Sequence, residues 1–501
     1  MSTRRLLSVV CLALMVGAPA QVVSGQQVPG RYADHFFGAV HLGDGDMAFA
    51  DSVGARWSRH GVRWHQHQPR PDSAYDFTAS ERLMTAARDH DVRLMPVLGN
   101  VPTWASTKDD TSAVNPHHYP PTEAAVDDWQ AYVEAIVERY PEVEYFEVWN
   151  EPNIDWFLNA DTNYTAYIDR VLIPAAQVIH AHDRKVVAPS FTLEWPMDSW
   201  PADARPDPDQ RNAQAAIEDL DRWLSYRDAW TYIDVLSVHY GKGDVTPSVP
   251  TMTSMMPVYD HIFDHWIRTG KLEGIWNTEA GLTASEAGTG GFVALEPWER
   301  APYAQWVPRY TIPVFHWALR HDWDSPQQYK LFWYHLAQKS PEAQGMLRRT
   351  NLVTPGRGEH RVSRTGDALN TVSTLLTSAD SIGTFDGTAT VGFGLNDNTN
   401  AANHFAPLSF TTYPFRLDDR VLVAAWLDRP GLTFESAQQG GIEVRVEGLR
   451  AEQTYRVETV DYVTGERTTV ATAVDAPGGT LRLDVPRTEA PILYLHVVPT
   501  G

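Results

Sequence analysis

Residues 122–149 read TEAAVDDWQAYVEAIVERYPEVEYFEVW, and this stretch holds one complete helix-to-strand unit. Its apolar residues up to Tyr140 recur at helical spacing, which predicts an amphipathic helix over 122–140 with one buried face. Pro141 ends that pattern, and the run 143–149 that follows is apolar enough for a strand covered on both faces. The stretch therefore predicts a helix that packs against a buried, parallel strand.

The same alternation continues on both sides of this unit. Eight apolar, strand-like runs separated by helical patterns cover residues 36–42, 61–65, 92–99, 143–149, 185–190, 234–240, 274–279 and 330–335. Eight strand–helix repeats within about 350 residues predict a (β/α)8 barrel. A doubly wound sheet would alternate as well, but the first run is followed only by Gly43-Asp44-Gly45 and not by a glycine-rich phosphate loop.

The sequence pattern changes after about residue 370, where residues 368–376 predict a last barrel helix. Six short runs with a two-residue period follow at 389–393, 421–426, 442–446, 455–460, 480–485 and 492–497. Short alternating runs separated by turn residues are typical of an all-β sandwich. We therefore expect a catalytic barrel over residues 21–378 and a β-sandwich over residues 379–501.

The N-terminal segment has the features of a secretory signal peptide. Arg4 and Arg5 precede an apolar run over residues 6–16, and Ala18-Pro19-Ala20 offers a small-residue cleavage site. The run is shorter than the roughly 20 apolar residues that span a bilayer, so no membrane span is expected. Residues 1–20 are thus predicted to be removed, which predicts a secreted or periplasmic protein. The single cysteine, Cys11, lies in this segment, so the mature chain would have no thiol nucleophile.

The composition excludes several other classes of protein. The chain is 43% hydrophobic, which is enough for a large core and argues against global disorder. Its net charge is −22, from 41 Lys and Arg against 63 Asp and Glu, and this argues against nucleic acid as a partner. The sequence does not indicate an oligomeric state.

Two glutamates occupy the positions at which a barrel of this type carries its chemistry. Glu151 follows the fourth run and Glu279 ends the seventh. The active site of a (β/α)8 barrel lies at the carboxyl ends of its strands, and strands four and seven face each other across the mouth. Two facing carboxyl groups are what cleavage of a glycosidic bond requires, one as an acid and one as a nucleophile or base. The pair predicts a glycoside hydrolase that acts on an oligo- or polysaccharide and needs no cofactor.

The segment Trp149-Asn150-Glu151-Pro152-Asn153 resembles the acid/base motif of retaining glycoside hydrolases of clan A, and most closely glycoside hydrolase family 39. Three further segments are similar to strands two, three and six of that family: residues 61–65, 101–106 and 237–240. The resemblance covers about residues 36–380.

The resemblance implies roles for individual residues. Glu151 would be the general acid/base and Glu279 the nucleophile of a β-glycosidase, and Asn150 would bond the 2-hydroxyl of the sugar. Arg63, with Tyr240 or His239, would hold Glu279 ionised, because a nearby cation favours the charged form of a carboxylate. Since the retaining mechanism needs carboxyl groups about 5–5.5 Å apart, we expect that separation here.

Other candidate sugar-binding residues lie near the predicted strand ends. Trp104, Trp156 and Trp333 could stack on sugar faces, and core packing is the alternative for each. Trp333 is favoured, because clan A enzymes usually have a tryptophan near the end of strand eight. His65 is expected to make a polar contact with the sugar.

Two alternatives to a glycoside hydrolase remain open. The first is a catalytically inactive, polysaccharide-binding barrel, although both glutamates are present. The second is a metal-dependent hydrolase that uses His65, His67 and His239. The His-x-His pair follows the second run and no histidine follows the fifth, unlike the arrangement in metal-dependent amidohydrolases, so we expect no metal.

Overall fold

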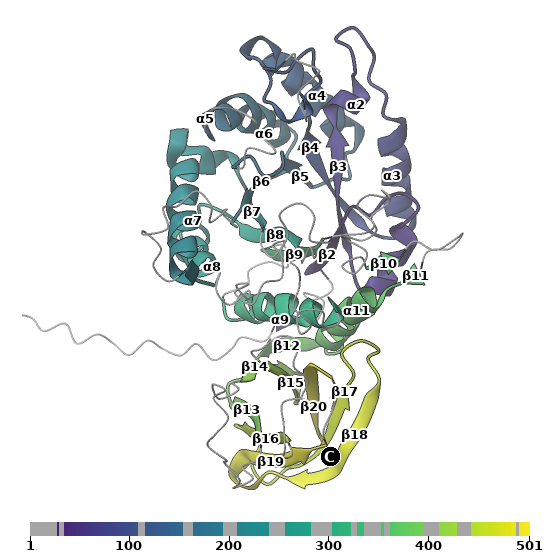
Figure 1. Ribbon diagram of the computed structural model, residues 1–501, viewed down its shortest axis with the longest axis vertical. Coiled ribbons are helices and arrows are strands. Elements are labelled where there is room, and N and C mark those ends of the chain that lie inside the picture. The colour runs from purple at the N-terminus through teal and green to yellow at the C-terminus, as the bar shows by residue number, and fades with distance from the viewer. Residues whose placement is uncertain are drawn as a thin grey trace, which may run out of the picture.

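The computed structural model describes residues 28–29, 35–108, 116–153, 164–193, 208–239, 256–281, 303–321, 328–334, 352–354, 361–393, 410–427, 442–486 and 490–501 (Figure 1). The predicted signal peptide, residues 1–20, lies outside these ranges. Within them, no helix combines the length and the apolar character needed to cross a membrane.

Eight parallel strands close into a barrel, as the sequence predicted (Figure 1). They are β2 (Phe37–Val40), β3 (Trp57–Arg63), β4 (Arg93–Gly99), β5 (Tyr145–Val148), β6 (Lys185–Thr192), β7 (Val235–His239), β8 (Gly274–Ala280) and β9 (Tyr329–Trp333). Each strand pairs in parallel with the next, and β9 pairs with β2 to close the ring.

One strand lies earlier in the chain than expected. The second run was predicted at residues 61–65, whereas β3 begins at Trp57 and ends at Arg63, and Trp64 already starts a helix. The residues that open β3, Trp57-Ser58-Arg59-His60, are not a continuous apolar run, which is why the pattern missed them. Because of this displacement, Arg59 and not Arg63 lies at the level of Glu279 in the barrel.

Helices form the outer layer of the barrel. They are α2 (Trp64–His67), α3 (Thr78–Asp89), α4 (Val126–Arg139), α5 (Tyr164–Tyr167), α6 (Ile173–Ala181), α7 (Pro208–Ser225), α8 (Met256–Ile262), α9 (Trp306–Leu319) and α11 (Arg364–Thr377). The helix predicted over 122–140 is a 3-10 turn, η4 (Glu123–Ala125), followed by α4. Its expected apolar face is buried, namely Trp129, Tyr132, Val133, Ile136 and Val137.

The barrel interior changes character along its axis. At the amino-terminal end a cluster of large side chains fills it, including Trp57, Tyr145, Trp276 and Phe332. Two residues further along three of these strands, the inward positions are polar: Arg59, Glu147 and Thr278. Because side chains alternate along a strand, this polar level lies directly above the apolar one and faces the carboxyl ends of the strands.

The second domain consists of two antiparallel sheets, and the predicted β-sandwich is confirmed. One sheet has the order β1-β12-β14-β15-β20-β17-β18 and the other β13-β16-β19. Their strands are β1 (Val28–Pro29), β12 (Ser381–Thr384), β13 (Thr388–Phe393), β14 (Phe410–Leu417), β15 (Arg420–Leu427), β16 (Ile442–Glu447), β17 (Thr454–Val460), β18 (Arg467–Asp475), β19 (Thr480–Val485) and β20 (Ile492–Pro499). A separate two-stranded ribbon pairs β10 (Val353–Thr354) with β11 (Arg361–Val362).

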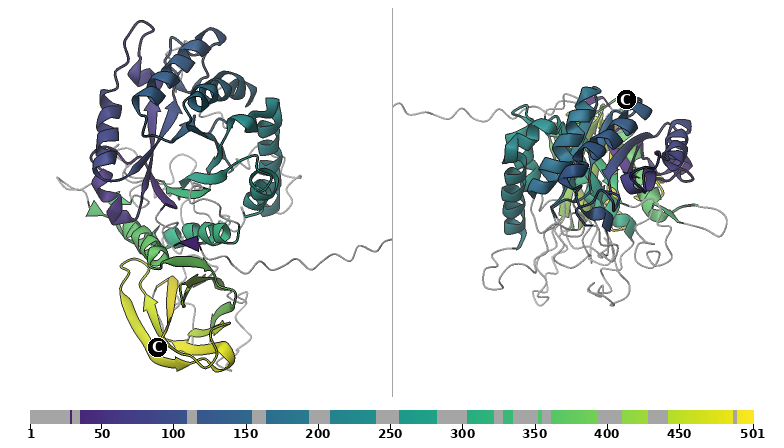
Figure 2. Two further views of the ribbon diagram at one scale, coloured as in Figure 1. Left: turned by 180° about the vertical axis from the view of Figure 1, so that it is seen from behind. Right: turned by 90° about the horizontal axis from the view of Figure 1, so that it is seen from above.

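The larger sheet packs against the barrel. Helices α9 and α11 lie between the two domains in both the front and the rear view (Figures 1 and 2). Arg309 of α9 lies between the rings of Trp306 and Trp426, with its guanidinium 5.8 and 5.7 Å from their centroids. It also donates a hydrogen bond to the Leu427 carbonyl at 3.0 Å. The apolar core therefore continues from the barrel into the second domain.

Candidate active site

A pocket of about 540 Å³ opens at the carboxyl ends of the barrel strands. Its lining includes residues at or just beyond the ends of β2, β3, β4, β5, β8 and β9. Both predicted catalytic glutamates and Asn150 line it. The site therefore lies where the parallel topology of the barrel places it.

Glu151 and Glu279 lie close together in this pocket, and both are nearly buried, at 3% and 4% exposed. One carboxylate oxygen of Glu151 lies within 4.8 Å of one of Glu279. Glu151 follows the end of β5, and its φ of 45° lies in the left-handed region. A non-glycine residue in this region is strained, and such strain is concentrated at functional sites.

Arg59 of β3 connects the nucleophile candidate to its surroundings. Its guanidinium donates hydrogen bonds to Glu279 and to Glu147, and donates to Asn150 Oδ1 at 2.7 Å. Burial disfavours the charged guanidinium, but the charges of Glu147 and Glu279 outweigh it, so the pKa of Arg59 lies above its ordinary value. Arg59 is thus a fixed cation that favours an ionised Glu279.

The resemblance implied that Arg63 contacts Glu279, whereas in the structure Arg59 makes this contact. Both arginines are in β3, four residues apart, so both face the inside of the barrel. Since β3 begins at Trp57, Arg59 lies at the level of Glu279, whereas Arg63 ends the strand and lines the pocket further out.

Glu147 is a buried carboxylate that sequence reasoning missed. Besides its contact with Arg59, it accepts hydrogen bonds from the hydroxyls of Ser190 and Thr278, both at 2.7 Å. Three donors thus satisfy the acceptor oxygens of this buried carboxylate. Its position in the apolar run 143–149 was a signal, because an acid within a buried strand needs a partner.

Thr278 connects Glu147 to His239 through two hydrogen bonds. Since its hydroxyl proton points to Glu147, Thr278 Oγ must accept from His239 Nε2, which lies 3.0 Å away. In its neutral form His239 then has no proton on Nδ1, the atom that lies 2.7 Å from Glu151 Oε1. While His239 is neutral, a hydrogen bond between these two atoms has the carboxyl of Glu151 as its donor.

A local irregularity makes this arrangement possible. The pairing of β8 with β7 shifts register between Val238 and His239, and its pairing with β9 shifts between Asn277 and Ala280. A bulge lets two consecutive residues face the same side of a sheet. Thr278 and Glu279 consequently both reach the barrel interior, one at Glu147 and the other at Arg59.

His239 is buried beside Glu151, whereas His65 lines the pocket. His239 Nδ1 bonds Glu151, and a ring nitrogen of His239 also lies within 4.8 Å of a carboxylate oxygen of Glu279, the partner that the resemblance implied. His65 lines the pocket and stacks on His117, with ring centroids 3.8 Å apart. Tyr240, the other candidate partner of Glu279, lies outside the described residues.

Two of the tryptophans proposed for sugar stacking, Trp333 and Trp104, pack against protein side chains. Trp333 is 1% exposed, and it faces the helices because Phe332, its neighbour in β9, faces the barrel interior. Tyr334 lines the pocket in its place. Trp104 is half-buried against Trp64 and donates to the Gln68 carbonyl at 3.2 Å. Trp156 lies outside the described residues.

The structure does not bring His65, His67 and His239 together as metal ligands. His67 bonds Tyr132 and Ser80 through its two ring nitrogens, at 3.0 and 2.9 Å. Both nitrogens of His239 are likewise engaged, by Glu151 and Thr278. The three histidines therefore lack a shared set of free nitrogens, which a metal site requires.

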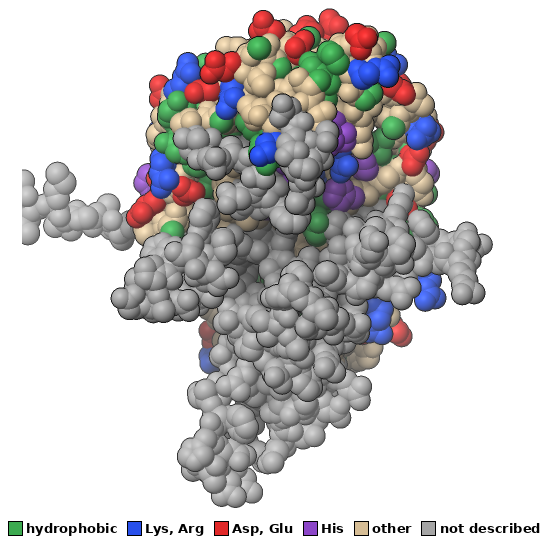
Figure 3. Space-filling model, turned by 45° about the horizontal axis from the view of Figure 1, so that its top comes forward, with side chains coloured by type: hydrophobic (Ala, Val, Ile, Leu, Met, Phe, Trp, Pro, Cys, Tyr) green, Lys and Arg blue, Asp and Glu red, His purple; other side chains and the backbone are tan. Residues whose placement is uncertain are grey.

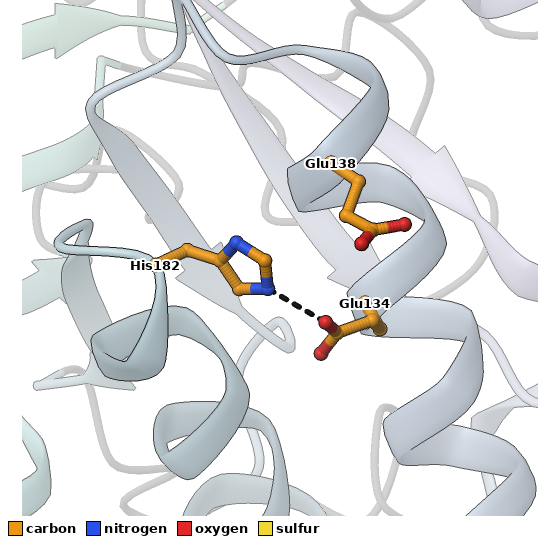
Figure 4. Close-up of side chains that lie close together, drawn as sticks. All are labelled: Glu134, Glu138 and His182. Atoms are coloured by element: carbon orange, nitrogen blue, oxygen red, sulfur yellow. Dashed lines mark hydrogen bonds and ion pairs between the residues drawn. The ribbon is translucent and has the colours of Figure 1, made fainter.

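Two groups of three possible ligands occur among the described residues. One is Glu151, His239 and Glu279, the site itself. The other is Glu134, Glu138 and His182 in the outer helical layer, where His182 Nε2 lies 2.7 Å from Glu134 (Figure 4). Glu134 and Glu138 are four residues apart on α4, the carboxylate of Glu134 turns toward His182, and the group is accessible to solvent. It has the character of a surface His–Glu ion pair.

No protein-family model matches the sequence, and no curated protein matches it. Solved structures match its fold over nearly its whole length. A GH30 endoxylanase from Clostridium papyrosolvens C71 is 12% identical, with a TM-score of 0.52 over 95% of this chain and 97% of that chain. A GH39 β-xylosidase from Caulobacter crescentus is 16% identical, with a TM-score of 0.54 over 95% and 98%.

A third structure, a GH39 enzyme from Xanthomonas axonopodis pv. citri, is 15% identical, with a TM-score of 0.53 over 93% of this chain and 95% of that chain. The chain therefore shares a barrel followed by a β-sandwich with glycoside hydrolases of families 30 and 39. In fold, the expected resemblance to clan A and family 39 is confirmed.

Proposed function

We propose that this protein is a retaining β-glycoside hydrolase with Glu151 as the general acid/base and Glu279 as the nucleophile. The observation that carries the proposal is the pair of carboxyl oxygens within 4.8 Å of each other at the mouth of the barrel. A retaining site has carboxyl groups about 5–5.5 Å apart, whereas an inverting site needs about 6.5–9.5 Å to admit a water.

The different partners of the two carboxyls support different roles. Glu279 is paired with the fixed cation Arg59, which suits a carboxylate that attacks the anomeric carbon. The carboxyl of Glu151 donates a hydrogen bond to neutral His239, which suits an acid that protonates the departing oxygen. Water would then attack the glycosyl–enzyme intermediate, and Glu151 would take its proton. Two carboxyl groups complete this reaction without a cofactor.

The proposed substrate is an oligo- or polysaccharide, and the protein is proposed to act after export. The solved structures of similar fold include an endoxylanase and a β-xylosidase, so xylan and aryl xylosides belong in the first panel. The basis for export is the N-terminal sequence, with its two arginines, its apolar run and its small-residue site. Asn150 is proposed to bond the sugar 2-hydroxyl, since it lines the pocket and Arg59 orients its side chain.

The test is release of reducing ends from a panel of polysaccharides and aryl glycosides by the full mature chain. We expect activity in the wild type, none in Glu279→Gln, and a loss of about 10²- to 10⁴-fold in Glu151→Gln. Glu134→Gln on the outer helical layer is the matched control and should keep full activity. Proton NMR of the first product should show the β-anomer, whereas the α-anomer would contradict the retaining assignment.

The alternatives give different results in the same assay. Activity that survives in Glu279→Gln but is lost in a chelator would favour a metal-dependent hydrolase. Binding of a polysaccharide without hydrolysis on any substrate would favour an inactive, binding barrel.

A further inference from the structure

One wall of the pocket carries several basic side chains. Arg63, at the end of β3, lines this wall with His65, His117 and His118. On the face shown in Figure 3, histidine side chains gather beside a Lys or Arg side chain. The chain as a whole has a net charge of −22, yet Glu151 and Glu279 are the only acidic residues in the described lining of the pocket. This wall of the pocket is thus basic, although the protein as a whole is acidic.

The backbone holds the two stacked histidines in place. His65 Nδ1 lies 3.3 Å from the Asn100 carbonyl, and His117 Nδ1 lies 2.9 Å from the Val101 carbonyl. Because a carbonyl only accepts, both Nδ1 atoms carry the proton, and both Nε2 atoms lack one while the rings are neutral. The rings are nearly parallel, with 9° between their planes, so protonation of both would place two like charges side by side.

Arg63 adds a permanent charge to this pair. Among the described residues, no carboxylate forms an ion pair with Arg63. Arg59, in the same strand, forms ion pairs with two carboxylates. Gly61 leaves room for the guanidinium, since a Cβ there would lie 3.2 Å from Arg63 Nε. A cation in a partly enclosed pocket is best stabilised by an anion, and charge-assisted hydrogen bonds to a carboxylate or a sulfate are the strongest available.

We propose that this basic wall, Arg63 with His65, His117 and His118, binds an anionic group of the glycan, so that the substrate class is an acidic polysaccharide. The group is a carboxylate or a sulfate ester on a sugar held next to Glu151 and Glu279. The proposal rests on the proposed function for the identity of the ligand as a glycan.

Binding of the anion is coupled to the protonation of His65. Burial first, then His117, Arg63 and His118, lower the pKa of His65 to about 4. An anion in contact with the wall offsets this repulsion and raises that pKa, so binding takes up a proton. The affinity for the anionic glycan therefore increases as the pH falls from 8 to 5.

The test measures binding to the full mature chain carrying Glu279→Gln, by calorimetry. The probes are polyglucuronate, polymannuronate and a sulfated galactan, each beside its neutral match made by carboxyl reduction or desulfation. At least one acidic polymer should bind about tenfold or more tightly than its match, and Arg63→Gln should bring that ratio close to one. Arg268→Gln, an equal charge change in the helical layer, should leave the ratio unchanged. The uronates and the sulfated polymer distinguish carboxylate from sulfate recognition.

Equal binding of every acidic polymer and its neutral match, or no binding of any, would overturn the proposal. The pH dependence should flatten in the double variant His65→Gln/His117→Gln, and a flat wild-type profile would remove the histidines from the site. A preference for acidic polymers with no hydrolysis by the wild type would refute the proposed function and leave the anion site standing. Hydrolysis of neutral glycans, with no preference for acidic polymers in binding, would support the proposed function and refute the anion site.

Discussion

Arg59 balances the buried charge of the site, since its guanidinium bonds two carboxylates, those of Glu147 and Glu279. Its side chain is 3% exposed, and those of Glu147 and Glu279 are 0% and 5% exposed. Removing one partner of such a group leaves uncompensated charge among nearly buried side chains.

Arg59→Met should therefore lower the free energy of unfolding by about 3–5 kcal/mol and abolish activity. Urea denaturation followed by tryptophan fluorescence measures the first effect. Arg56→Met, which removes a surface arginine paired with Asp51, is the control and should cost less than about 1 kcal/mol. A stable Arg59→Met protein would show that Glu147 and Glu279 do not depend on the guanidinium.

Thr278 is a positioning residue, because it acts on Glu151 only through His239. Thr278→Val keeps the shape of the side chain but removes the acceptor of His239 Nε2. His239 can then carry its proton on Nδ1 and donate to an ionised Glu151, which no longer serves as an acid. We expect kcat/KM to fall about 10- to 100-fold for poor leaving groups and much less for dinitrophenyl glycosides, which need no acid.

Thr278→Ser retains the hydroxyl and should recover most of the activity. Nitrogen NMR of His239 gives a readout independent of activity, with the proton on Nε2 in the wild type and on Nδ1 in Thr278→Val. An unchanged tautomer in the valine variant, or equal losses on both classes of leaving group, would contradict this role.

The sequence predicted some of these residues and not others for a physical reason. Glu151 and Glu279 end buried runs, where a charge is conspicuous, and the structure brings them together. Arg59 lies inside a strand with several polar residues, so a search for continuous apolar runs does not find it. A bulge in β8 brings Glu279 to the same side as Thr278, which strict alternation does not reveal.

At the level of elements, a strand was visible in the sequence when it was buried and apolar. Most barrel strands are covered on both faces, and their runs lie within a few residues of the observed bounds. In the second domain β18 was missed, because it is an edge strand with mostly exposed or half-buried side chains. β14 was missed as well, because Pro414 and its threonines interrupt the pattern of apolar residues.

Close packing inside the barrel gives a further prediction for β2. A Cβ on Gly38 would lie 2.4 Å from the ring of Phe332, which is buried in the interior cluster. Gly38→Ala should lower the free energy of unfolding by about 1–3 kcal/mol, because the ring has no space into which to move. Gly392→Ala in β13, where a Cβ meets nothing within 4 Å, is the control. Equal urea midpoints for the two variants would contradict this account.

At the scale of the whole molecule, the two domains meet through α9 and the larger sheet of the sandwich. His316 of α9 packs on Tyr413 and Phe415 of β14, with ring centroids 5.3 Å apart in both cases. Burial, and after it Arg320, lower the pKa of His316 to about 4. The packed interface therefore requires the neutral imidazole.

The lowered pKa of His316 means that the folded protein loses stability as the pH falls. Between about pH 6.5 and about pH 4, His316 binds a proton more readily in the unfolded or undocked chain than in the folded protein. Its contribution to stability is thus complete above pH 6.5 and decreases as the pH falls through that window. His316→Leu fills the same apolar contact without a titrating group, so the drop in Tm between pH 7 and pH 5 should be smaller than in the wild type.

The exposed histidine His90 provides the control, because His90→Leu should keep the acid dependence of the wild type. The location of the effect is checked by hydrogen exchange, in which α9 and β14 should lose protection first as the wild type is acidified. If His316→Leu left the acid dependence of Tm unchanged, the group that titrates would lie elsewhere. The next residues to test are then His67 of the barrel and His496 of the sandwich, since burial lowers the pKa of each to about 4. Because the apolar core of the barrel continues into the larger sheet of the sandwich, a change confined to their contact should still shift the unfolding of both domains together.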